Sequence, residues 1–99
     1  MPYRAVDLSR VQTYPLPNRH SRVALENLVL PDAPAPEFES PDLEEVAQRI
    51  AAARMAGRPV IWSLGAHVVK RGLSPLLIDL MQRGVITHLA SNGATTIHD

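Results

Sequence analysis

Two short apolar segments with a helical segment between them constrain the fold more than any other feature of this sequence. Val60–Leu64 and Val85–Ala90 are rich in β-branched residues and too short for typical helices, which favours buried strands. Leu73–Arg83 carries leucines at helical spacing, with Ser74 suited to cap the helix, Pro75 to its first turn and Gly84 to its end. Two such strands joined by a helix form a parallel βαβ unit. The sequence therefore predicts an α/β fold, specifically a Rossmann-like parallel βαβ fragment.

The segment before the first strand predicts a second helix. Ser40 is suited to cap it, Pro41 to occupy its first turn, and Gly57 to end it. A stripe of apolar residues recurs at helical spacing, so we expect one face of this helix to be buried against the sheet. The stripe consists of Leu43, Val46, Ala47, Ile50 and Ala51.

We expect residues 1–39 to form an extended arm and a proline-rich linker. Residues 40–99 are expected to form the folded part. Proline fixes its own φ and disfavours helix at the preceding residue, so Tyr14–Asn18 and Pro31–Pro36 are expected to be extended or turning. Ser21–Leu28 predicts a short helix with Ser21 as its cap.

The small number of strands predicts a piece of a larger fold. Two strands and two helices would leave sheet edges and one sheet face exposed to water. We therefore expect the N-terminal part of a longer protein, truncated at Asp99, close to the start of a further helix. The alternative is a small complete domain that dimerises to cover its sheet.

The composition excludes several classes of function for this chain. Lys and Arg number 10, as do Asp and Glu, so the formal net charge is +0 and no overall field attracts nucleic acid or an anionic membrane. No apolar run approaches the roughly 20 residues of a membrane span, and the N-terminus lacks a signal-peptide core. The absence of cysteine excludes disulfides and thiolate metal sites. We expect a cytoplasmic protein with no nucleic-acid partner and no membrane partner.

The candidate functional site lies where the two predicted strands end. Parallel sheets bind ligands outside the carboxyl ends of their strands, and a small-residue loop follows each strand here. Glycine in such loops permits close approach of a ligand, so we predict one crevice that contacts a dinucleotide or a phosphate. The GxGxxG fingerprint is absent, and the alternative is two simple turns. The candidate residues are Gly65, Ala66, His67 and Val68 in the first loop, and Ser91, Asn92, Gly93 and Ala94 in the second.

The histidines raise a metal-site alternative. His67, His98 and Asp99 could converge at the crevice and serve a metal-dependent hydrolase. No His-x-x-x-His spacing supports this, so we predict no metal site and expect His98 in the first turn of a further helix. Lys70–Arg71 is expected to be a solvated basic pair, with a phosphate contact as the alternative.

The run from Val60 to Asp99 resembles the N-terminal part of the deoxyhypusine synthase-like family, particularly its bacterial members. In that family a hydrophobic strand ends in a Thr-Ser-Asn-Leu-type loop, followed by a glycine, a helix and a second strand ending in Thr-Thr-Ala-Gly-Gly. Here Gly65–Val68 stands at the first loop, Gly72 at the following glycine, and Ser91–Thr95 at the second loop. Ile97 and His98 stand where the family has glutamates.

The resemblance implies an N-terminal part of an NAD-dependent aminobutyl transferase. It implies NAD as cofactor, a polyamine or another amine as substrate, a protein lysine as a candidate acceptor, and a homotetramer. The NAD-contacting positions would be Ala66, His67, Val68, Asn92, Gly93 and Ala94. The family's imine-forming lysine lies beyond Asp99, so we assign no catalytic residue and expect this chain alone to be inactive. The alternatives are a non-catalytic nucleotide- or phosphate-binding module and a pure interaction piece.

Overall fold

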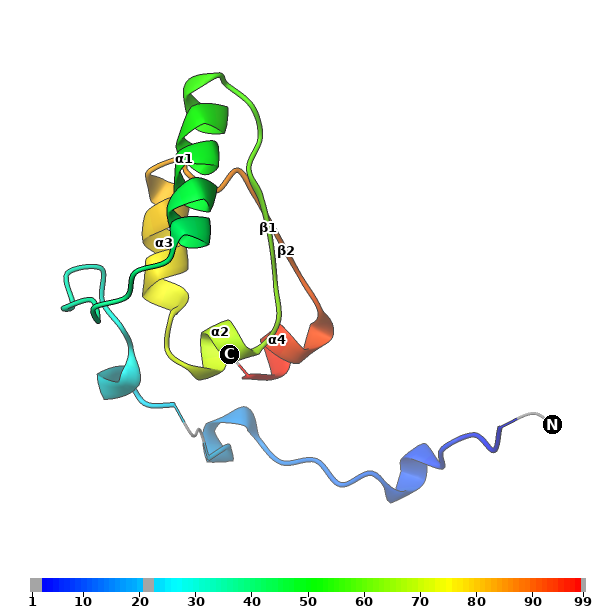
Figure 1. The fold of residues 1–99 in the computed structure, drawn as a ribbon. Coiled ribbons are helices and arrows are strands. Elements are labelled where there is room, and N and C mark those ends of the chain that lie inside the picture. The colour runs from blue at the N-terminus through cyan, green and yellow to red at the C-terminus, as the bar shows by residue number, and fades with distance from the viewer. Residues whose placement is uncertain (1–2, 21–22, 99) are drawn as a thin grey trace.

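Two parallel strands and the helices beside them form the folded part of the molecule (Figure 1). The computed structural model describes residues 3–20 and 23–98. Strands β1 (Ile61–Leu64) and β2 (His88–Ser91) pair in parallel, with Leu64 opposite Ser91. The helices are α1 (Pro41–Met55), α2 (His67–Lys70), α3 (Ser74–Gln82) and α4 (Gly93–His98). The predicted mixed α/β fold with a parallel sheet is confirmed, whereas two strands do not define a Rossmann-like fold.

The second strand begins later than the sequence predicted, at His88 rather than Val85. The N–H groups of Val85 and Ile86 both donate to the Leu80 carbonyl, so this apolar stretch closes the end of α3. Ile86 enters the core, where 4% of its surface is exposed. The apolar run therefore contains a helix exit and a core residue before the strand starts, which strand propensity alone does not distinguish.

Helix α1 begins and ends as predicted. The Ser40 hydroxyl accepts a hydrogen bond from the Leu43 N–H at 3.3 Å, and Pro41 occupies the first turn. Gly57 follows the helix with a φ of +68°, a conformation that costs glycine little. At its C-terminal end, the Arg54 Nε donates to the Gly84 carbonyl at 2.7 Å and so ties α1 to the end of α3.

The apolar stripe of α1 was predicted to be buried against the sheet, and this prediction is wrong. Leu43 is 55% exposed and Val46 is 51% exposed, while Ile50 is half-buried. Both α1 and α3 stand to the left of the sheet in Figure 1, and α3 is the helix that supplies a core residue. The amphipathic pattern correctly predicted a helix but not a partner for its apolar face.

Helix α3 starts differently from the prediction. Leu73 occupies the N-cap position and makes no side-chain capping bond, while Ser74–Pro75 forms the first two helical positions. Ser74 as the cap is therefore wrong, because the chain enters α3 from the turn after α2 one residue earlier than expected. Gly84 follows α3 with a φ of +71°, as predicted. In the part of the chain that the structure describes, the buried apolar residues are Val60, Leu77 and Ile86.

The N-terminal arm has an extended backbone over residues 3–20. Residues 3–20 are exposed throughout and contain only short 3-10 turns at Leu8–Arg10 and Leu16–Asn18. The radius of gyration is 18.8 Å, well above the value of about 13 Å typical of a compact chain of this length. In Figure 1 the arm runs away from the folded part towards its N-terminal end. Within the described residues, no helix is both long and apolar enough to cross a membrane.

The later part of the arm returns to the folded part. The Val29 N–H donates to the Gly72 carbonyl at 2.8 Å. The predicted helix over Ser21–Leu28 is reduced to a 3-10 turn, Leu25–Asn27, in which the Asn27 side chain accepts from the Ala24 N–H at 2.8 Å. Ser21, the predicted cap, lies outside the described residues.

Candidate functional site

The two predicted loops lie at the same edge of the sheet. Parallel pairing places Leu64 opposite Ser91, so Gly65–Val68 and Ser91–Ala94 leave the strands as neighbours. The Ser91 hydroxyl donates to the Leu64 carbonyl at 3.0 Å and bridges the two strand ends. Figure 1 shows α2 and α4, which follow these loops, together at this end of the molecule. We call the eight residues 65–68 and 91–94 the strand-exit edge.

The second loop leads directly into a helix, α4, so the alternative of a simple turn at Asn92–Gly93 is wrong. The Asn92 side-chain oxygen accepts from the Ala94 N–H at 3.2 Å, and α4 starts at Gly93. His98 consequently belongs to this helix rather than to the first turn of a later one. The hydroxyls of Ser91 and Thr95 also contact each other across the first turn. Polar side chains of this loop therefore fix its own backbone.

The glycines of the strand-exit edge are not required by the fold. Neither Gly65 nor Gly93 has a positive φ, and a Cβ atom at either position would meet nothing within 4 Å. By contrast, a Cβ at Gly72 would collide with the Asn27 carbonyl of the arm. Gly65 and Gly93 thus leave open space beside the backbone at the edge.

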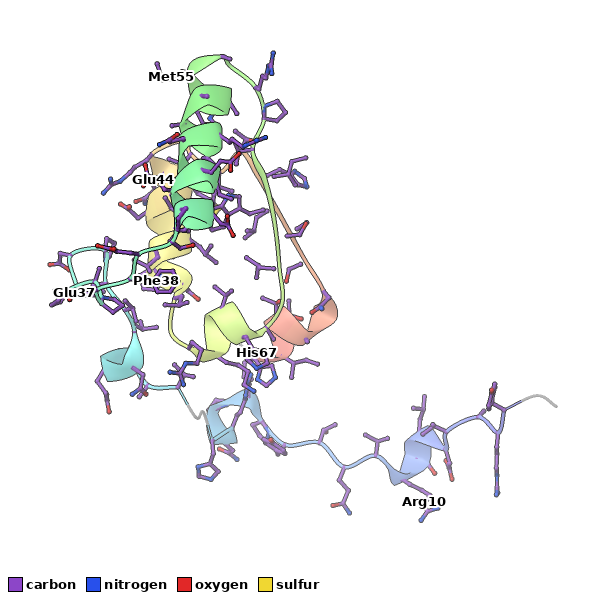
Figure 2. The ribbon with its side chains drawn as sticks, in the orientation of Figure 1. Arg10, Glu37, Phe38, Glu44, Met55 and His67 are labelled. Atoms are coloured by element: carbon purple, nitrogen blue, oxygen red, sulfur yellow. The ribbon has the colours of Figure 1, made fainter. Side chains whose placement is uncertain are left out.

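The first loop leads directly into α2. Ala66 is the N-cap residue of this short helix and is half-buried, as is Val68. His67 is exposed and lies at the α2 and α4 end of the molecule (Figure 2). Its imidazole has no hydrogen-bond partner among the described residues. The structure therefore starts both predicted loops at neighbouring strand ends but gives His67 no fixed role.

A cavity of about 770 Å³ opens next to the strand-exit edge. It lies between the arm and the helices α2 and α4, and none of the eight predicted residues lines it. Sequence analysis missed this cavity because it forms only when the arm folds back, which no local periodicity encodes. Lys70 and His98, which the sequence offers as a phosphate contact and a metal ligand in two alternatives, are the hints of this cavity. The basic groups that line it are Arg19, His20, Lys70 and His98.

The metal alternative gains no geometric support. Over residues 3–20 and 23–98, no three His, Cys, Asp or Glu side chains are grouped closely enough to hold a metal ion. His67 and His98 belong to α2 and α4, and Asp99 lies outside the described residues.

Comparisons with known proteins do not test the resemblance to the deoxyhypusine synthase-like family, which rests on the sequence alone. No protein-family model, no curated protein and no solved structure matches this chain.

Proposed function

We propose that this chain contributes one half of an NAD-binding crevice to a cytoplasmic, oligomeric transferase similar to the deoxyhypusine synthases. In this proposal the cofactor lies across the strand-exit edge of a Rossmann-like sheet. The observation that carries it is the parallel register of β1 and β2, which makes Gly65–Val68 and Ser91–Ala94 neighbours. Ligands of open parallel sheets bind outside such strand ends.

The open space at the two glycines supports close approach of a ligand. Because neither Gly65 nor Gly93 is required by backbone conformation or by packing, a phosphate group could reach the main-chain N–H groups there. Asn92 already uses its side-chain oxygen to cap α4. Its amide nitrogen is therefore the part of this side chain that would donate a hydrogen bond to the cofactor.

Amine transfer depends on the resemblance alone. Lys70 is the single lysine of the chain, and it lines the cavity rather than the strand-exit edge. A lysine that forms an imine with the aminobutyl group would thus be supplied from outside the 99 residues. The polyamine substrate, a protein lysine acceptor and the tetramer belong to the proposal on the same basis.

A second candidate function is a non-catalytic nucleotide- or phosphate-binding module. Between Leu64 and His98 the sequence contains one acidic residue, Asp79, and that carboxylate pairs with Arg83 at 2.9 Å. A polyamine at the strand-exit edge would therefore meet no carboxylate from this segment. The shortage of acidic side chains favours the binding of an anionic ligand. It does not favour the binding of a polyamine, which is a cation.

Calorimetric titration of the chain with NAD, ADP, inorganic phosphate and spermidine tests the proposal. The transferase proposal predicts one NAD per chain, bound more tightly than ADP. Equal affinity for ADP and NAD, or binding of inorganic phosphate alone, would favour the module, and no binding of NAD, ADP or inorganic phosphate would contradict both.

Asn92→Asp provides the site-specific variant. Aspartate preserves the cap on the Ala94 N–H but places a negative charge beside the expected pyrophosphate. We expect NAD affinity to fall about tenfold, equivalent to ~1.4 kcal/mol, with unchanged thermal stability. Asn18→Asp in the exposed arm is the matched control and should leave NAD affinity unchanged. Unaltered NAD affinity in the Asn92 variant would remove Asn92 from the site.

A further inference from the structure

The cavity between the arm and the helices α2 and α4 has a mixed lining of a specific kind. Its walls are apolar on both sides, with Leu25 and Leu28 from the arm and Val69 and Ile97 from the helices. Its volume, about 770 Å³, falls in the range of sites for small organic molecules, roughly 300 to 1,000 Å³. An apolar ligand portion would find contacts on two faces.

Among the described residues that line the cavity, every ionisable side chain is basic. Arg19 and Lys70 contribute cationic groups, and His20 and His98 contribute imidazoles. None of the described residues that line the cavity is acidic, although the whole chain has a formal net charge of +0. The local excess of basic groups therefore does not follow from composition, and it favours an anion over a cation.

The arm is fixed to the folded part on both sides of this cavity. The Arg19 guanidinium donates to the Ile97 carbonyl at 2.6 Å, which attaches the arm to α4. Further along, the Val29 N–H donates to the Gly72 carbonyl at 2.8 Å, just after α2. Gly72 has a φ of +75° and leaves no room for a side chain beneath Asn27, so the two backbones are in close contact. These anchors position the arm wall of the cavity.

We propose that this cavity binds a small organic anion with an apolar body, that is, an alkyl or aryl carboxylate or phosphate. Arg19 and Lys70 hold the anionic group, while the apolar body lies between the arm turn and the α2 and α4 side chains. None of the lining residues belongs to the strand-exit edge, so this site is separate from the proposed NAD crevice.

A matched ligand series tests the chemistry of the site. The full chain is titrated by calorimetry with octanoate, octyl phosphate, octylamine and inorganic phosphate. We expect octanoate and octyl phosphate to bind at one per chain, octylamine not to bind, and inorganic phosphate to bind at least tenfold more weakly than octyl phosphate. The stronger of the two octyl anions then identifies the headgroup. Equal binding of octylamine and octanoate, or no binding of either octyl anion, would overturn the proposal.

Charge-removing variants locate the site. Arg19→Gln and Lys70→Gln should each lower the affinity for the preferred octyl anion about tenfold. Arg10→Gln in the distal arm (Figure 2) and Arg71→Gln beside Lys70 remove one positive charge each without touching the cavity, and should change the affinity less than twofold. Because loss of Arg19 also removes an arm anchor, Lys70→Gln is the decisive variant. An unchanged affinity in that variant would overturn the assignment.

Competition separates this site from the proposed function. The octanoate titration is repeated with NAD present at saturation, or at millimolar concentration if NAD shows no binding. Retained octanoate binding supports a separate anion site whether or not NAD binds. Loss of octanoate binding in the presence of NAD would show that the cavity is part of a nucleotide site and would overturn the separate site.

Discussion

Thr87 is the residue that aligns the two strands before their regular pairing begins. Its hydroxyl accepts from the Val60 N–H at 2.8 Å and donates to the Val60 carbonyl at 2.9 Å. The Thr87 N–H also donates to the same carbonyl at 3.0 Å. One side chain thereby satisfies both main-chain groups of a core residue just ahead of β1.

We expect Thr87→Val to destabilise the fold by about 1–2 kcal/mol, because valine keeps the shape but leaves the Val60 N–H without its partner. Urea unfolding followed by circular dichroism measures the change. Thr13→Val in the exposed arm is the control and should be neutral. A neutral Thr87→Val would mean that water replaces the hydroxyl at no cost.

Gly72 has two reasons to be glycine, and a substitution series separates them. A Cβ there would be strained by the φ of +75° and would collide with the Asn27 carbonyl, whereas at Gly84 a φ of +71° is combined with open space. We expect Gly84→Ala to cost about 1–2 kcal/mol from backbone strain alone. Gly72→Ala should cost more and release the arm, which limited proteolysis between residues 20 and 30 would detect. Equal protease resistance in the two variants would contradict the described docking of the arm.

At the scale of elements, helix signals were the most informative part of the sequence. Ser40, Gly57 and Gly84 mark helix ends correctly because capping and positive φ are decided by a few neighbouring residues. Ser74 was misassigned because the chain reaches α3 through a turn fixed by Gly72, a tertiary contact. The late start of β2 has a local origin instead, since the N–H groups of Val85 and Ile86 donate to the Leu80 carbonyl and so still belong to the end of α3.

Only part of the candidate site could likewise be predicted from the sequence. The strand-exit edge followed from the order of elements, because parallel strands place their carboxyl ends together. The cavity could not be predicted from the order of elements, because Arg19 lies far from Ile97 in the sequence and no periodic pattern predicts their contact. Helix pattern also failed to show which apolar face is covered, as α1 demonstrates with its exposed Leu43.

The two main helices should respond differently to truncation of an apolar side chain. Leu77 of α3 is buried, at 8% exposure, so Leu77→Ala should destabilise the chain by about 2–3 kcal/mol or prevent folding. Leu43→Ala on α1 should cost less than about 1 kcal/mol, because the side chain is already half in water. Thermal unfolding of both variants at two protein concentrations is the measurement. A large, concentration-dependent effect of Leu43→Ala would show that another chain covers α1.

At the scale of the whole molecule, the small core and the extended arm set the context for any site. Few apolar side chains of the described residues are buried. The arm forms a wall of the cavity only because hydrogen bonds at its later end hold it against the folded part. Function in this molecule is therefore expected at one end, where β1 and β2 leave the sheet and α2, α4 and the arm meet (Figure 1).

Amide chemical-shift mapping with NAD tests the central claim most directly. The ¹⁵N-labelled chain is titrated with NAD, and shift changes are followed residue by residue. We expect the largest changes at Gly65–Val68 and Ser91–Ala94, with little change along α1. Changes confined to the arm or to α1, or no change at millimolar NAD, would contradict it.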